Sequence, residues 1–276
     1  MAKAAAAKDM AVVQQNAGLP GIPDELNGYT GLEGITEESW IIPRIKIVQP
    51  TSKEGTAGLL RLNLTGDEFS ELSIIVIKAN QGRVLWNPDD DAEEDVLCRS
   101  YDYLKPDDSI KSPPSPICAK FVPGRGGKQI LKQVCPMSIW GKDGERPECD
   151  STYNLLCISV DELLPFWITL SGTSIKPVKR YLSAIALRRV PLWQYSTNLS
   201  TKEQPGKKGK YYVAEFLSPK PISPELEQDI TGMVISLKDA DIKRTFEEEE
   251  AQADGSEEGG NGSGGTEPPP DWVTNG

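Results

Sequence analysis

The sequence predicts a mainly-β protein of the α+β class, with one helix inserted into a series of strands. Segments rich in Ile, Leu and Val recur at strand length through the middle of the 276-residue chain, some alternating with polar residues and some continuously apolar. One segment, 173–189, instead has apolar residues three and four positions apart, which is the spacing of a helix face. Gly- and Pro-containing stretches separate several of these segments, as turns and loops require.

The elements are expected in the following order. Two short lead-in strands occupy "SWIIPRIKIVQP" and "LLRLNLTGDEF". A long strand covers 71–86, and after an insertion of about 65 residues come strands at 151–160 and 164–172. The helix over 173–189 has Thr173 or Ser174 as its N-cap, Pro177 in its first turn, and Pro191 beyond its end. Finally, "LWQYSTNLSTKE" and "KYYVAEFLS" supply two strands around the loop "QPGKKG".

Three strands, a helix and two strands follow one another in the order of an OB-fold. The prediction is therefore an OB-fold-like five-stranded barrel with its helix between strands 3 and 4 and an insertion between strands 1 and 2. Another α+β sheet is the alternative, because this order does not fix barrel closure. The predicted organisation is a disordered leader at 1–38, a folded domain at 39–244 that includes the insertion at 96–150, and a disordered acidic tail at 245–276.

The composition limits the classes of function. The chain has no His, which excludes Ser-His-Asp triads and the common His-bearing zinc enzymes, and it has no phosphate-binding P-loop motif. The acidic run "NPDDDAEED" leaves a metal-dependent nuclease as an alternative, but we expect the protein not to be an enzyme. No apolar run approaches the ~18 residues that cross a bilayer, so we expect a cytoplasmic protein without membrane contact.

Four cysteines lie in the Pro-, Gly- and charge-rich insertion, namely Cys98, Cys118, Cys135 and Cys149. Four thiolates around Zn²⁺ would fold such a segment, because metal binding replaces the burial of apolar side chains. The gaps of 19, 16 and 13 residues do not match a standard zinc ribbon, so free structural cysteines are the alternative. Cys157 lies within an apolar strand and is interpreted as a core residue.

Charge is strongly segregated along the chain. Residues 151–220 contain ten Lys or Arg and four Asp or Glu, a net +6, whereas 245–276 contain nine Asp or Glu and no Lys or Arg, a net −9. A single-strand binder needs cations along the phosphates and aromatic faces for the bases. The basic block supplies both, and the candidates for nucleic-acid binding are Trp167, Lys176, Lys179, Arg180, Lys202, Lys207, Lys208, Lys210, Tyr211 and Tyr212.

Each of these candidates also has a structural alternative. In "LPFWITL" alternation places Trp167 on the face opposite Phe166 and Ile168, where it would either stack on a base or pack under the insertion. The cations of the helix and of the loop would equally suit a solvated surface. A zinc-stapled interaction or virion protein without affinity for nucleic acid is the corresponding alternative function.

Several motifs resemble a group of bacteriophage and prophage proteins thought to bind single-stranded DNA. They include "IIPRIKIVQPTSKEGTAG", "GRVLW", "CPMSIWGKDGERPECDSTYNLL", "TSIKPVKRYLSAIA" and "GKYYVAEF", and the likeness extends from about 40 to 218. The resemblance implies an OB-like core, zinc on the four cysteines of the insertion, and a role in phage DNA replication or recombination in the host cytoplasm. A homo-oligomer is compatible with it.

The acidic tail also resembles the tails of bacterial and phage single-strand binders, in which acidic residues compete with DNA and an apolar tip docks on replication or recombination proteins. Here Trp272 and Val273 are the expected partner-binding residues, although Thr-Asn-Gly follows them. A tail that only increases solubility is the alternative.

Overall fold

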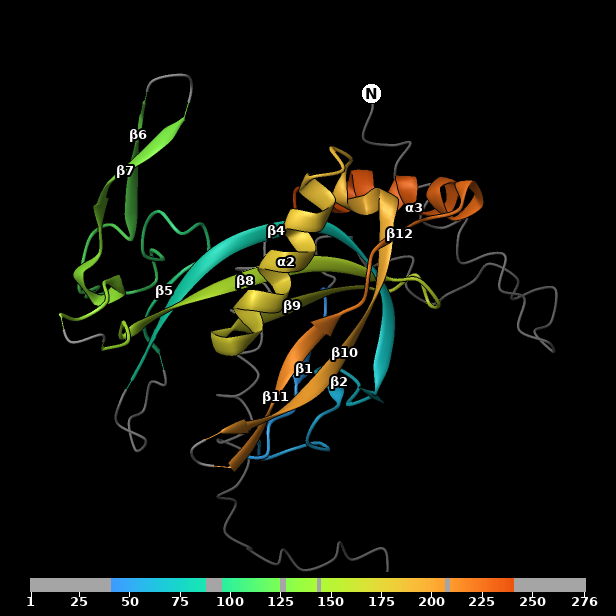
Figure 1. Cartoon of the computed structure of the whole chain (residues 1–276), viewed down its shortest axis with the longest axis horizontal. Helices are drawn as coiled ribbons and strands as arrows, with labels where there is room; N and C mark the ends of the chain where they lie inside the picture. Colours follow the sequence, from blue (N-terminus) through green and yellow to red (C-terminus); the bar gives the residue numbers. More distant parts are fainter. Residues whose placement is uncertain (1–40, 88–95, 125–127, 143–144, 207–208, 241–276) are drawn as a thin grey trace, which may run out of the picture.

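One strongly curled sheet organises the molecule, a computed structural model that describes residues 41–87, 96–124, 128–142, 145–206 and 209–240 (Figure 1). The strands follow the order β11-β10-β4-β8-β9-β1-β2-β3, with β5 added beside β4 and β12 beside β10. The sheet is mixed, because β1 pairs in parallel with β9 and the remaining pairs are antiparallel. The prediction of a mainly-β protein is confirmed.

The strands of this sheet are β1 (Arg44–Ile47), β2 (Leu60–Leu62), β3 (Glu68–Phe69), β4 (Glu71–Trp86), β5 (Val96–Ser100), β8 (Cys149–Ser159), β9 (Pro165–Ser171), β10 (Tyr195–Gly206), β11 (Gly209–Phe216) and β12 (Lys220–Pro221). A separate two-stranded hairpin consists of β6 (Ala119–Pro123) and β7 (Gln129–Val134). The helices are α2 (Ile175–Ala186), α3 (Pro224–Leu237) and the short 3-10 helices η4 (Pro136–Ser138), η5 (Gly172–Ser174) and η6 (Leu192–Gln194).

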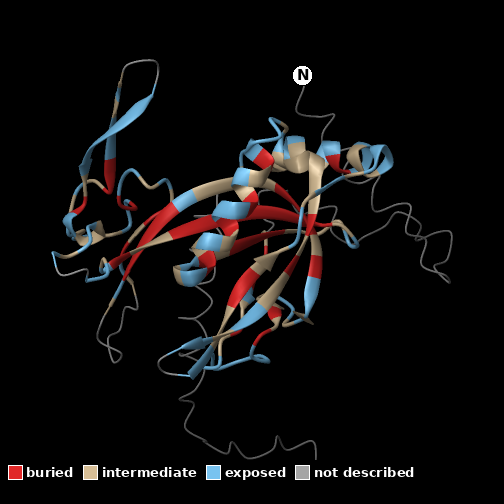
Figure 2. Cartoon of the chain, viewed as in Figure 1, coloured by how far each residue is buried: buried red, intermediate tan, exposed pale blue. Residues whose placement is uncertain are grey.

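The inner face of the sheet and α2 enclose the main core (Figure 2). Alternation along β9 points Phe166, Ile168 and Leu170 into this core. Val178, Tyr181 and Ile185 of α2 cover them at helical spacing. Ser174 occupies the N-cap position of α2, as predicted, but its hydroxyl accepts a hydrogen bond from Ala214 N–H (3.0 Å) and caps no amide of the helix. That bond ties the start of α2 to β11.

The outer face of the sheet is covered by α3, a helix that the sequence analysis did not include. Ile230 of α3 packs on Ile75 and Ile158, and Leu237 contacts a second cluster formed by Trp167 and Leu156. Ser223 caps this helix by accepting a hydrogen bond from Leu226 N–H, with Pro224 in the first turn. The order Ser-Pro-Glu is therefore the signal from which α3 could have been predicted.

A short arm at the start of the domain joins the two sides of the curled sheet. β1 pairs with β9, and Gln49, just beyond β1, accepts from the N–H of Tyr212 (2.9 Å) and donates to its carbonyl (2.8 Å) on β11. Thr201 on β10 donates to the carbonyl of Gly58. Gly58 has φ +91°, and a Cβ there would come within 2.6 Å of the Tyr212 ring, so any other residue would strain the backbone and displace that ring.

Candidate nucleic-acid interface and cysteine cluster

An open groove of about 440 Å³ lies between α2 and the β10–β11 pair. Its cations are Lys176 and Arg180, one turn apart on α2, and Lys202 on β10. Phe216, at the end of β11, lines the groove and stacks on Tyr181 with ring centroids 5.0 Å apart. The fold thus brings three of the predicted cations to one concave surface.

The two aromatic rings of this groove were not among the sequence candidates. Tyr181 is buried in the main core, whereas Phe216 packs against that core and is partly exposed beside the cations. Phe216 shares with Ala214 the face of β11 that packs on the core, so the sequence pattern indicates a core residue there and gives no signal for the groove. The aromatic surface of the groove is therefore Phe216, and not the predicted Trp167, Tyr211 or Tyr212.

Trp167 has the position predicted for it and not the proposed role. It does project from the face of β9 opposite Phe166, yet its side chain is 0 % exposed. Ile42, Ile77 and Leu237 pack against it. A fully enclosed ring offers no face to a base, so the expectation that Trp167 stacks on DNA is wrong, and the packing alternative holds with α3 supplying part of the cover.

Tyr212 likewise has a structural role. Its backbone is held by Gln49 and its ring lies against Gly58, while its hydroxyl donates to Glu203 (3.3 Å). Tyr211 is half-buried beside Gly206 at the turn of the β10–β11 hairpin. The Tyr212 ring therefore serves first to seat the N-terminal arm.

Of the remaining predicted cations, the structure describes Lys179 and Lys210, and neither lines the groove. Lys210 forms an ion pair with Glu203 (2.8 Å), and this hydrogen bond lowers the pKa of the Glu203 carboxyl and raises the pKa of Lys210. The Lys179 ammonium lies 6.0 Å from the centroid of the Tyr153 ring. Lys207, Lys208, Trp272 and Val273, and the acidic run at 89–95, lie outside the described residues. Lys202, which does line the groove, forms an ion pair there with Glu215, with 3.7 Å between Nζ and Oε1.

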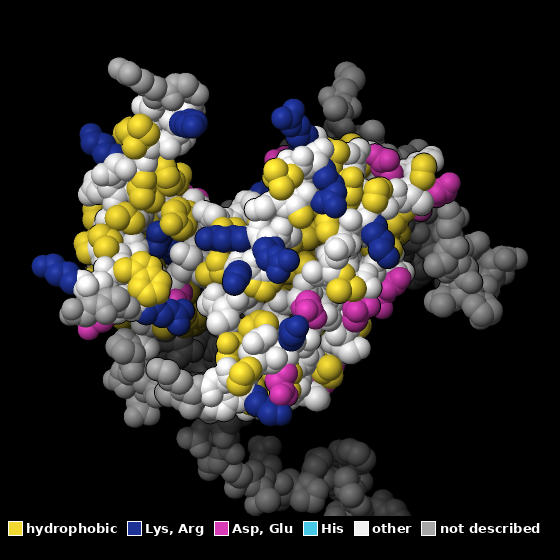
Figure 3. All heavy atoms as spheres, viewed as in Figure 1, with side chains coloured by type: hydrophobic (Ala, Val, Ile, Leu, Met, Phe, Trp, Pro, Cys, Tyr) yellow, Lys and Arg dark blue, Asp and Glu magenta, His cyan; other side chains and the backbone are white. Residues whose placement is uncertain are grey.

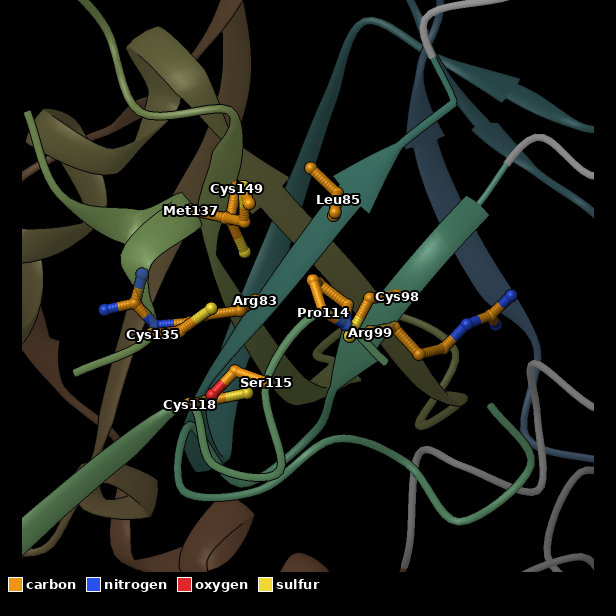
Figure 4. Close-up of a pocket in the computed structure, with 10 residues that line it drawn as sticks. All are labelled: Arg83, Leu85, Cys98, Arg99, Pro114, Ser115, Cys118, Cys135, Met137 and Cys149. Atoms are coloured by element: carbon orange, nitrogen blue, oxygen red, sulfur yellow. The ribbon is translucent and has the colours of Figure 1, made fainter. Parts of the chain in front are cut away.

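The second candidate site is a cavity of about 10 Å³ that all four cysteines of the insertion line (Figure 4). Cys98 lies on β5 and Cys149 begins β8, and both are paired with Leu85 of the intervening strand β4. Cys118 and Cys135 immediately precede β6 and follow β7, and Cys135 N–H donates to Cys118 O (3.0 Å). A hairpin thus occupies the wide gap between these two cysteines and returns the chain to its starting point.

Burial raises the pKa of three of the thiols that line this cavity. It raises the pKa of Cys98 and of Cys149 to about 11, and raises the pKa of Cys118 in spite of a hydrogen bond with Ser100. The nearby thiols raise these pKa values further, because their negative charges would repel one another. The raised pKa values favour the neutral thiol at Cys98, Cys118 and Cys149 when no metal ion joins them.

Arg83 places a buried positive charge beside this cavity. Its side chain on β4 is 6 % exposed, donates to the Tyr103 hydroxyl (2.5 Å), and lies 4.1 Å from the centroid of that ring. It forms no ion pair with a carboxylate in the described part of the chain, and its Nε has no hydrogen-bond partner there. Its charge opposes the rise in pKa at Cys118 and Cys149. A buried cation of this kind suits a cluster that becomes anionic.

The donor set fits zinc, since four thiolates form a common tetrahedral site and the cavity has room for one ion. The four side chains surround the cavity, and across the ranges that the structure describes no group of three or more Cys, Asp or Glu is already arranged as a metal site. Ligation requires all four sulfurs to lie about 2.3 Å from a common centre. Cys157 lies apart from the cluster, fully buried in the main core.

None of the helices within the described ranges is long and apolar enough to span a membrane. Comparison of the chain with protein-family models, with curated proteins and with solved structures finds no match in any of the three.

Proposed function

We propose that this protein binds single-stranded DNA without strong sequence preference and acts in phage DNA replication or recombination. The observation that carries the proposal is the groove between α2 and β10–β11, in which Lys176, Arg180 and Lys202 lie beside the Phe216 ring. Cations that track a phosphate backbone beside an aromatic face are what sequence-tolerant single-strand binding requires. The net +6 over 151–220, in a chain with an overall charge of −11, supports the same function.

The arrangement of strands supports an OB-like core. When β4, β8, β9, β10 and β11 are numbered 1 to 5, their order in the sheet is 5-4-1-2-3, and α2 lies between the third and fourth. In an OB-fold the ends of such a sheet approach each other. Here the approach is made through the N-terminal arm, whose β1 pairs with β9 and whose Gln49 binds β11.

The cysteine cluster would hold a structural zinc ion through Cys98, Cys118, Cys135 and Cys149. Bound zinc would supply folding free energy to the insertion, which buries few apolar side chains. The buried charge of Arg83 would offset part of the negative charge of four thiolates.

The acidic tail at 245–276 would compete with DNA for the groove, and Trp272 and Val273 would dock on replication or recombination proteins. Charge complementarity supports the first role, because nine carboxylates are tethered to a basic body.

The test is an anisotropy titration of labelled oligo(dT) at several salt concentrations, with unlabelled single-stranded DNA, duplex DNA and RNA as competitors. We expect binding that weakens steeply with salt and that single strands compete away better than duplex. Lack of binding to any single strand at low salt would leave the alternative of a zinc-stapled interaction protein. Cleavage of the labelled strand in the presence of Mg²⁺ would instead favour the nuclease.

A further inference from the structure

The insertion carries a basic surface that is separate from the groove. Residues 119–142 contain five Lys or Arg and no Asp or Glu, in a chain whose overall charge is −11. The described cations of this segment are Lys120, Lys128, Lys132 and Lys142. In the β6–β7 hairpin Lys120 is paired with Gln133, and Lys132 is the residue that precedes Gln133 in β7. The local charge is therefore that of a surface for a polyanion.

The same segment exposes large apolar side chains, and Figure 2 shows much of the β6–β7 hairpin in the colour of exposed residues. Of the twelve large hydrophobic side chains exposed in the described ranges, five lie here, namely Phe121, Ile130, Leu131, Ile139 and Trp140. Trp140 is 66 % exposed, the largest value among the described tryptophans. An exposed indole and an excess of lysine within one segment supply the two kinds of group that bind bases and phosphates of a single strand. A patch made only for an apolar protein partner would not need the excess of positive charge.

The cysteine cluster fixes the position of this surface. Cys118 and Cys135 hold the two ends of the hairpin together, and η4 follows Cys135 directly, with Met137 lining the same cavity as the thiols. Trp140 lies two residues beyond η4, and Gly141 N–H donates to Glu145 O (2.9 Å) in the turn that follows. The hairpin and Trp140 are thus anchored to β4, β5 and β8.

The insertion and α2 face the same side of the molecule. Figure 3 shows a hollow between the two parts, with Lys and Arg side chains on both sides of it. A flexible strand bound in the groove can therefore continue toward the hairpin without passing around the molecule.

We propose that the insertion is a second contact site for the same single strand, with Trp140 stacking on a base and with Lys128 and Lys132 contacting phosphates. This inference rests on the proposed single-strand binding and adds to it a longer path that leads from the groove to the hairpin. It also gives the cysteine cluster a function, because the cluster sets the place of the second site relative to the first.

The test compares oligo(dT) of about 8 nucleotides, enough for the groove alone, with oligo(dT) of about 40, using the zinc-loaded full chain. On the long strand Trp140→Ala should weaken binding about tenfold, and Trp140→Phe should restore it. Lys128→Glu with Lys132→Glu should lower the slope of log K against log salt by about 1.4, at about 0.7 for each phosphate contact. On the short strand all three variants should bind like wild type.

Two substitutions serve as controls, Ile235→Ala on α3 for the apolar change and Lys238→Glu, directly after α3, for the charge change. Both side chains are exposed, and α3 lies at the end of the molecule opposite the insertion (Figure 1). Circular dichroism and zinc content verify that each variant is folded. If wild type binds neither strand, the proposed function fails. If wild type binds the long strand and the insertion variants bind it equally well, only this inference fails. Insertion variants that alter self-association in sedimentation velocity, with DNA affinity unchanged, would also overturn it and assign the surface to protein contact.

Discussion

Replacement of Trp167 by Ala should lower the free energy of unfolding of this protein and leave its affinity for DNA unchanged. The indole is completely buried between the sheet and α3, and Leu237 packs against it. Truncation of a buried Trp to Ala in such an environment costs about 3–5 kcal/mol. The indole Nε1–H is buried without a hydrogen-bond partner in the described part of the chain, and loss of an unsatisfied donor returns about 1–3 kcal/mol. We therefore expect Trp167→Ala to lower the free energy of unfolding by about 2 kcal/mol, the middle of the range of about 0–4 kcal/mol that these two terms leave.

Trp167→Phe refines the test. Phe keeps most of the apolar contact with Leu156 and removes the unsatisfied donor, so the cavity and the relieved N–H should nearly cancel, and we expect the free energy of unfolding to change by less than about 1 kcal/mol.

The assay is urea unfolding followed by far-UV circular dichroism, together with oligo(dT) titration in the absence of denaturant. Both variants should bind DNA as wild type does while they remain folded, because the ring has no exposed face. A Trp167→Ala protein that keeps its stability but loses affinity would refute the reasoning and return this residue to the binding surface.

Three further predictions concern the groove, the thiols and the tail. Lys176→Glu with Arg180→Glu should lower the slope of log K against log salt by about 1.4. Between 50 and 200 mM salt the variant should therefore lose about 7-fold less affinity for oligo(dT) than wild type loses. An unchanged slope would show that these cations do not contact phosphate. Purified protein should contain about one zinc per chain by metal analysis, with alkylation of Cys98, Cys118, Cys135 and Cys149 detected by mass spectrometry only after chelation. Cys157, whose pKa is raised by burial, should stay unmodified either way, and Cys135→Ser should loosen the insertion. Deletion of 245–276 should tighten oligo(dT) binding at low salt, and this gain should disappear above roughly 0.3 M salt; a truncated chain with wild-type affinity at low salt would remove the competitor role. Trp272→Ala with Val273→Ala should leave DNA affinity unchanged but abolish capture of replication proteins.

The regular elements of the sheet were predictable because their signals are local. The strand expected at 71–86 is β4, and those expected at 151–160 and 164–172 are β8 and β9 within two residues. The helix expected over 173–189 is α2, which ends earlier, at Ala186. Alternation in β9 gave the correct face for Trp167.

The burial of that face could not be read from β9, because its cover comes from α3, more than fifty residues later in the chain. The groove shows the same limit. Lys202 and Arg180 were recognised as cations, but their meeting beside Phe216 depends on how α2 packs on β11, and Arg83 became a candidate only when pairing of β4 with β8 placed it beside the thiols. Contacts between distant segments decide both sites.

Because Cys135 N–H donates to Cys118 O, the two cysteines lie side by side whatever the length of the hairpin between them. Residues added to or removed from β6 and β7 in cross-strand pairs would change how far the hairpin extends and leave both thiols where they are. A search that relies on fixed cysteine spacing would miss such a site, whereas a search for two cysteines that flank a hairpin would find it.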